Sequence, residues 1–160
     1  MTAGAEFRAA MRHVPSSVTV VTSLRDGEPR GLTLTSFASV SVDPPALLVC
    51  VNREARSYLY ISESKVFCVN VLSGEQRHIG EHFAGKVRDR QFETIEYGTD
   101  ATGAPVLANT IAHFDCRVLE EHHVGSHSIF VGAVVSCSAR TGSPLGYFDG
   151  GYRDFGIRVE

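Results

Sequence analysis

The chain lacks the features that mark three large classes of protein: nucleic-acid binders, membrane proteins and secreted proteins. Its 15 lysines and arginines are outnumbered by 18 aspartates and glutamates, and no basic tract offsets the formal net charge of −3. The longest apolar runs, such as residues 129–135, are too short to cross a bilayer. The first residues contain no apolar segment typical of a secretory signal. We therefore predict no nucleic-acid partner, no membrane partner and a cytoplasmic location.

The sequence also lacks paired cysteines. Its four cysteines, Cys50, Cys68, Cys116 and Cys137, form no Cys-x-x-Cys motif. Each lies in an apolar or alternating segment, where an isolated cysteine behaves as a small hydrophobic residue. A reducing compartment disfavours disulfides. The pattern predicts four buried free thiols.

No Gly-x-Gly-x-x-Gly motif joins a strand to a helix, so a Rossmann dinucleotide domain is not predicted. A nicotinamide cofactor, if one is used, must be held by another architecture. Residues 80–86 fit Gly-x-x-x-x-Gly-Lys, but Val87 stands where a P-loop requires serine or threonine. ATP binding at a P-loop is therefore not predicted either.

One motif suggests zinc. Residues 78–82 read HIGEH, which fits the His-x-x-Glu-His pattern of one class of zinc peptidases. His78 and His82 would share a helix face, with Glu81 beside them as a base. However, Gly80 weakens the middle of that helix, and no third ligand is identifiable. We expect a polar helix face and no metal site.

What the sequence does contain is a series of β-strand patterns. Residues 17–24 form a β-branched run, and the Asp26-Gly27 turn leads into residues 31–42, which we expect to pair back as a hairpin. Pro44 and Pro45 end that strand, because proline cannot donate to a ladder. Further strands are predicted at residues 46–51, 66–72, 112–121 and 128–139, and helical segments at residues 6–14, 56–64 and 75–83.

These elements predict the fold class. Six or seven strands with few helices and no alternation of strand and helix favour a mainly β protein, an antiparallel barrel. At 160 residues, with no internal repeat or linker, the chain is expected to be one domain over residues 1–160.

The stretch GLTLTSFASVSVDPP, residues 31–45, carries a row of hydroxyl side chains on a strand pattern. Such residues occur on the solvent face of a half-buried strand, and they also line ligand grooves. Together with VPSSVTVVT (14–22), ALLVCVNREARS (46–57), VFCVNVLSGEQ (66–76), HFAGKVRDRQF (82–92), GSHSIFVGAV (125–134) and PLGYFDGGY (144–152), this stretch resembles the flavin reductase family. Its most specific part is T-x-T-S-F followed by S-V-S-x-x-P-P.

The resemblance implies an FMN-binding split β-barrel that forms a homodimer. It implies hydride transfer from NADH or NADPH to FMN or FAD, with reduced flavin supplied to a partner flavin-dependent monooxygenase. The hydride passes directly between cofactors, so no catalytic residue is expected. Two other classes remain open: a non-enzymatic flavin or haem carrier on the same barrel, and an enzyme like pyridoxamine-phosphate oxidase.

The resemblance also implies a flavin site. Taken singly, these residues have ordinary alternatives: strand hydroxyls on the surface, phenylalanines in the core, an asparagine that caps a turn. The bases of residues 86–90 could help to hold an anionic ligand. The implied flavin-binding residues are Ser16, Ser17, Thr33, Thr35, Ser36, Phe37, Asn52, Arg53, Ser57, Phe83, Ala84 and Gly85.

A second set is implied for the nicotinamide. His127 matches the histidine that the family places over the open face of the flavin, and Tyr152 and Arg153 are expected to cover the same site. Ser126 replaces an aspartate of the family pattern, and Ala133 stands where glutamate is frequent. The hydrogen bond from that aspartate is therefore not expected here.

Overall fold

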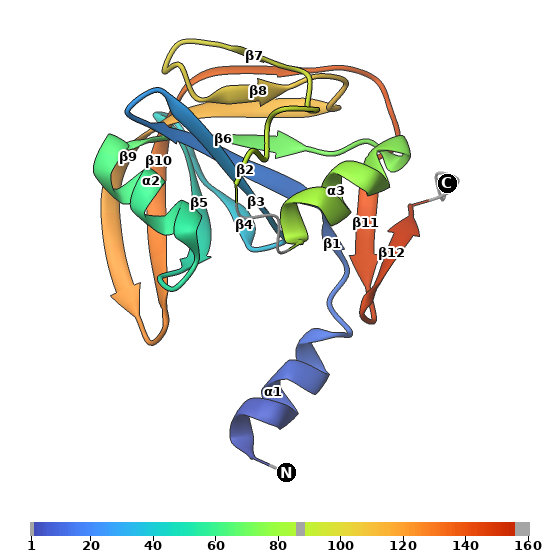
Figure 1. The fold of residues 1–160 in the computed structure, drawn as a ribbon. Helices are drawn as coiled ribbons and strands as arrows, with labels where there is room; N and C mark the ends of the chain where they lie inside the picture. The colour runs from blue at the N-terminus through green and yellow to red at the C-terminus, as the bar shows by residue number, and fades with distance from the viewer. Residues whose placement is uncertain (1, 86–88, 156–160) are drawn as a thin grey trace.

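Seven antiparallel strands form the main sheet of the computed structural model, which describes residues 2–85 and 89–155 (Figure 1). They lie in the order β3-β2-β6-β9-β10-β5-β4. The prediction of a mainly β, antiparallel split barrel is confirmed. The strands are β2 (Thr19–Arg25), β3 (Glu28–Leu34), β4 (Phe37–Val42), β5 (Pro45–Asn52), β6 (Val66–Val71), β9 (Ala112–Val124) and β10 (His127–Ala139).

The sheet curls because β3 and β4 are consecutive in the chain yet lie at opposite ends of the strand order. Only Thr35 and Ser36 join them, so the two edges must approach each other there. The prediction of a single strand over residues 31–42 is wrong: β3 pairs with β2, whereas β4 pairs with β5. The alternation of polar and apolar residues continues across the break and does not reveal it.

The turns agree better with the sequence-based predictions than the strand boundaries do. Asp26 and Gly27 have φ values of 52° and 78°, the two positive values of a type I′ turn, and the predicted hairpin of β2 and β3 is confirmed. β4 ends before the prolines, as predicted. Pro45 is the first residue of β5, a position that proline tolerates.

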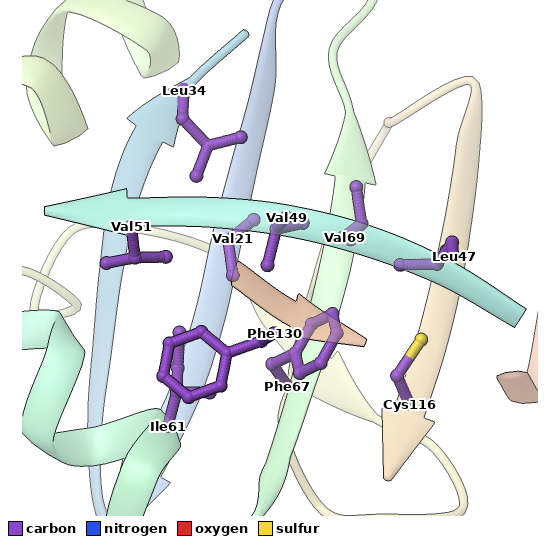
Figure 2. Close-up of a cluster of buried hydrophobic side chains, with 10 residues drawn as sticks. All are labelled: Val21, Leu34, Leu47, Val49, Val51, Ile61, Phe67, Val69, Cys116 and Phe130. Carbon is purple, nitrogen blue, oxygen red and sulfur yellow. The ribbon is translucent and has the colours of Figure 1, made fainter. Parts of the chain in front are cut away.

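Side chains from six strands and one helix fill the barrel (Figure 2). Phe67 and Phe130 are fully buried at its centre, and Ile61 of α2 (Arg56–Ser64) points at them from one end. Burying each such side chain contributes about 1.5–3 kcal/mol. Helix α2, which was predicted over the same residues, therefore closes that end of the barrel.

A second cluster lies outside the barrel, under α3 (Arg77–Ala84) and the short 3₁₀ helix η1 (Gly74–Gln76). Phe83, Leu72 and Leu145 are its main members. The sequence did not predict four short strands that flank the barrel, because these strands contain few β-branched residues. They are β7 (Tyr97–Thr99), β8 (Pro105–Leu107), β11 (Leu145–Phe148) and β12 (Gly151–Asp154); β11 and β12 form a small sheet with β1 (Ser16–Ser17).

Helix α1 (Ala3–Met11) extends away from the barrel (Figure 1). The predicted helix is confirmed, although it begins earlier and ends at Met11. None of its residues is buried, and Phe7 is 66% exposed. An ion pair of 3.1 Å between Arg12 and Asp149 connects the end of this segment to the β11–β12 turn.

The four cysteines are free, but they are not all buried. Cys68 and Cys116 are buried, Cys50 is half-buried, and Cys137 is exposed near the end of β10. The expectation of a buried thiol is therefore wrong for Cys137, and it holds only in part for Cys50. In residues 2–85 and 89–155, no helix is both long enough and apolar enough to span a membrane.

Candidate functional site: two clefts along one strand

The first cleft, of about 550 Å³, lies where β3 meets α2 and α3. Two arginines, one glutamate, hydroxyl residues and small residues meet in it, from β3, the start of α2, the end of α3 and the segment after α3. Its lining consists of Arg30, Gly31, Leu32, Thr33, Glu54, Ala55, Arg56, Ser57, Phe83, Ala84, Gly85 and Gln91.

Gly31 allows these segments to meet. A Cβ atom at this position would lie 2.8 Å from the ring of Phe83, so only glycine leaves room for the ring. The Gly31 N–H donates to Oε1 of Gln91 at 3.2 Å, and the Ser57 hydroxyl donates to the Gly31 carbonyl at 3.2 Å. The backbone of β3 is thereby connected to α2, α3 and the segment that follows α3.

The polar groups of the first cleft suit an anion. The Thr33 hydroxyl donates to the Gly80 carbonyl at 2.7 Å, and its oxygen can still accept a hydrogen bond. Arg56 lies 3.1 Å from Asp89, and the Arg30 guanidinium lies 5.1 Å above the ring of Tyr60. Guanidinium and hydroxyl groups that converge on one cleft are the usual partners of a phosphate.

The second cleft, of about 630 Å³, lies between α1 and the β11–β12 turn. Tyr147 and Phe148 contribute aromatic surface, and Met11 and Val14 contribute aliphatic surface. This cleft suits a flat, largely apolar ring system. Its lining consists of Ala5, Arg8, Ala9, Met11, Arg12, Val14, Ser16, Thr35, Tyr147, Phe148, Asp149 and Gly150.

Thr33 and Thr35 show that the two clefts are neighbours. Thr33 lines the first cleft and Thr35 lines the second, and only Leu34 stands between them in the chain. Thr33 belongs to β3, and Thr35 follows Leu34, the last residue of that strand. The two clefts therefore adjoin at the end of β3, an arrangement that fits an elongated ligand with a ring at one end and an anion at the other.

The structure brings seven of the predicted flavin residues to these clefts. Ser17 is half-buried in β1, where it pairs with Gly146, and it lines neither cleft. Thr33, Ser57, Phe83, Ala84 and Gly85 line the first cleft, and Ser16 and Thr35 line the second.

The other four predicted residues contact the protein itself. The Ser36 hydroxyl donates to the Cys50 carbonyl at 2.9 Å, and Phe37 packs against Phe114 with ring centroids 5.8 Å apart. Their roles in flavin binding stay predictions.

The flavin-binding roles of Asn52 and Arg53, in the loop after β5, also stay predictions. Oδ1 of Asn52 accepts a hydrogen bond from the N–H of Glu54 at 3.0 Å, which caps the turn. Nη2 of Arg53 donates to the carbonyl of Gly125. Neither Asn52 nor Arg53 lines the first or the second cleft.

The predicted nicotinamide residues are separated within one chain. His127 begins β10 and is exposed, whereas Tyr152 and Arg153 lie on β12 at the opposite side of the molecule (Figure 1). Burial and the nearby Glu81 raise the pKa of Tyr152, and the guanidinium of Arg77, 5.4 Å from its ring, opposes this shift.

Sequence reasoning missed several cleft residues. Arg30, Arg56, Gln91, Tyr147 and Phe148 were not singled out, although all but Arg30 stand inside segments that carried the family resemblance. Membership of those segments was the available signal. Arg30 carried none, because the predicted strand begins at residue 31, whereas β3 begins at Glu28 in the structure.

The HIGEH segment forms most of α3. Nε2 of His82 lies 2.7 Å from the Gln91 carbonyl, and Arg77 pairs with Glu81 at 2.8 Å. Within the described residues, no three histidine, cysteine or acidic side chains gather as metal ligands would. Residues 86–88 of the predicted basic run lie outside the described residues.

Comparison with known proteins agrees with this geometry. The flavin reductase like domain matches residues 11–156. The chain is 38% identical over 155 residues to the FMN reductase (NADH) RutF of Bradyrhizobium diazoefficiens, covering 95% of this chain and 86% of that protein. It is 42% identical over 153 residues to a flavin reductase (NADH) of Kitasatospora aureofaciens, covering 93% and 80%.

Among solved structures, the chain is similar to the NADH:FAD oxidoreductase SgcE6 of Streptomyces globisporus in complex with NAD and FAD fragments. The TM-score is 0.92 at 31% identity, with 99% of this chain and 96% of that chain covered. The domain match, the relatives and the shared fold agree along nearly the whole chain. This chain belongs to the flavin reductase family.

Proposed function

We propose that this protein is an NADH-dependent flavin reductase that supplies reduced flavin to a partner monooxygenase. The observation that carries the proposal is the pair of adjoining clefts that Thr33 and Thr35 line. One contains Arg30 and Arg56, and the other contains Tyr147 and Phe148. Relatives with the same function in their names support it, among them the reductase subunit HsaB of a flavin-dependent monooxygenase from Rhodococcus jostii, 35% identical over 147 residues, 91% of this chain and 75% of that protein.

The residues of both clefts fit FMN. Arg56, Ser57 and Thr33 would hold the phosphate and ribityl end, and Ser16 and Thr35 would meet the ring beside Tyr147 and Phe148 in the second cleft. The FAD phosphates suit the same cations, so both flavins are candidates.

When bound, the nicotinamide supplies a hydride from C4 to N5 of the flavin, and the cofactors carry that chemistry. The chain therefore needs no acid–base pair. Its residues hold one ring against the other at near-attack distance and exclude water between them. His127, Tyr152 and Arg153 are the proposed nicotinamide contacts.

We further infer that the protein is a homodimer, because the outer face of β5 and β10 is apolar. Ile129 and Val131 of β10 lie opposite Cys50 and Leu48 of β5, on the outside of the barrel, and all four are only half-buried. An outer face in contact with water would carry polar residues. A second copy on this face would also explain how His127, remote from Tyr152 in one chain, contributes to a complete site. A cytoplasmic location is proposed from the free thiols.

The activity test measures NADH and NADPH oxidation with FMN, with FAD and without flavin. Oxidation of NADH should depend on added flavin. A rate no higher with flavin than without it would contradict the proposal and favour a non-enzymatic carrier of flavin or haem.

A variant adds a test of the cleft. Thr33→Val should weaken flavin binding by about 1–3 kcal/mol, because a polar group of the ligand loses its partner, and the dissociation constant should rise roughly five- to a hundredfold. Thr99→Val on β7 is the control, since this exposed residue lines neither cleft. Unchanged flavin affinity in Thr33→Val would remove this side chain from the site.

A further inference from the structure

One residue of the loop after β5 holds the turn between β9 and β10. The backbone N–H of Arg53 donates to the Ser126 carbonyl at 3.0 Å, and Nη2 of its guanidinium donates to the Gly125 carbonyl at 2.5 Å. Gly125 has a φ of 57°, the left-handed conformation that favours glycine in tight turns. Both carbonyls of the turn thus accept hydrogen bonds from Arg53.

His127 follows this turn directly. It is the first residue of β10, and its register partner is Asn52, the residue before Arg53. Nδ1 of its imidazole lies 2.9 Å from the Ser126 hydroxyl. The ring itself is exposed, so its place depends on the geometry of the turn and on this one side-chain contact.

The loop that carries Arg53 is itself fixed. Oδ1 of Asn52 accepts from the N–H of Glu54 at 3.0 Å, and the Asn52 carbonyl accepts from the N–H of Ala55 at 3.0 Å. Helix α2 begins immediately afterwards at Arg56, and it is anchored in the barrel by Ile61. The guanidinium therefore connects a rigid part of the molecule to an exposed turn.

We propose that Arg53 is a positioning residue for His127. It orders the β9–β10 turn and thereby holds the imidazole where it meets the nicotinamide. This inference rests on the proposed function, and it gives Arg53 a different role from the direct flavin contact that the family resemblance implies. The backbone hydrogen bond to Ser126 does not need the side chain, so truncation should loosen the turn without unfolding it.

The test compares Arg53→Ala and Arg53→Lys with the control Arg140→Ala. Arg140 is also exposed and also donates to two loop carbonyls, those of Thr110, at 2.9 Å, and Asn109, but it lies beyond the far end of β10. Three quantities are measured: steady-state kinetics with varied NADH, the flavin dissociation constant by fluorescence, and amide hydrogen exchange of residues 124–127.

In Arg53→Ala we expect kcat/KM for NADH to fall about tenfold, mainly through KM, with an unchanged flavin dissociation constant. Amides in residues 124–127 should exchange faster. Arg53→Lys, which keeps a cationic donor, should recover part of both losses, and Arg140→Ala should match the wild type in both.

Three outcomes would overturn the inference. A weakened flavin affinity with unchanged KM for NADH would make Arg53 a flavin ligand. Equal exchange rates in Arg53→Ala and the wild type would show that the side chain does not order the turn. Equal kinetic losses in Arg53→Ala and Arg140→Ala would indicate a general structural effect. If the wild type oxidises no NADH with either flavin, the proposed function fails, and the exchange measurement still decides whether Arg53 orders the turn.

Discussion

At the scale of single residues, Gly31 decides whether the first cleft can form. Its missing side chain leaves space for the ring of Phe83, and both of its backbone polar groups bond to other segments of the cleft. These bonds fix β3 against α2 and against the segment after α3. The residue therefore matters through its backbone and its small size.

We predict that Gly31→Ala destabilises the protein and weakens flavin binding. The new Cβ would lie 2.8 Å from the Phe83 ring, and displacing a packed ring costs about 1–3 kcal/mol. Urea denaturation and flavin titration measure the two effects. The control is Gly98→Ala on β7, where an added Cβ meets nothing within 4 Å. If Gly31→Ala has the stability and the flavin affinity of the wild type, the cleft adapts to the larger residue and the prediction is wrong.

At the scale of elements, one carboxylate connects β9 to α2. Glu121 lies 3.0 Å from the hydroxyl of Ser62, 3.2 Å from Nε2 of His123 and 3.6 Å from Nζ of Lys65. Burial by itself raises the pKa of Glu121, but hydrogen bonds from Tyr58, Ser62 and His123 outweigh it. The pKa therefore lies below its ordinary value of 4.5.

This shift predicts an acid-dependent loss of stability. A carboxylate with a lowered folded-state pKa stabilises the protein fully above its unfolded value, near 4.5, and the contribution is lost as the pH falls through the lower folded value. Glu121→Gln should therefore weaken the dependence of the urea midpoint on pH below about 5. Glu120→Gln is the matched control, because this exposed neighbour pairs with His122 of its own strand, at 2.6 Å, and not with α2. An identical acid profile in Glu121→Gln and the wild type would contradict the assignment.

At the scale of the whole molecule, the apolar outer face of the barrel predicts self-association. A stable interface buries roughly 800 Å² on each partner. On the neighbouring strand β4, Ala38 is exposed and lies opposite Leu48, so it extends the face. Ala38→Glu should turn the dimer into a monomer in sedimentation velocity and lower NADH oxidation, because His127 of one copy would no longer lie beside Tyr152 and Arg153 of the other.

The control for this experiment is Leu59→Glu on α2, which is 47% exposed and lies away from that face. It should leave the oligomeric state unchanged. A wild-type protein that sediments as a monomer at all concentrations, yet oxidises NADH with flavin present, would contradict the dimer and the shared nicotinamide site together.

The sequence by itself determined the family, the fold class and most of the long strands. β-branched, apolar and alternating runs located β2, β5, β6, β9 and β10, and the Asp26-Gly27 pair predicted the first hairpin. These features are local, because side-chain period and turn residues act over a few positions. The family motifs, in their order along the chain, then identified the split barrel. No local pattern shows how the sheet curls to close that barrel.

Only the tertiary structure decided where the chain breaks between β3 and β4, and which hydroxyls line a cleft. Thr33 and Thr35 point to clefts, whereas Ser36 bonds to Cys50 and Asn52 caps its own turn. The identity of a residue specifies what it can donate or accept, but its partner depends on how the sheet curls and which distant segments reach it. Arg53 shows the difference most clearly: its sequence neighbours indicated a ligand, and its contact is a turn 72 residues away.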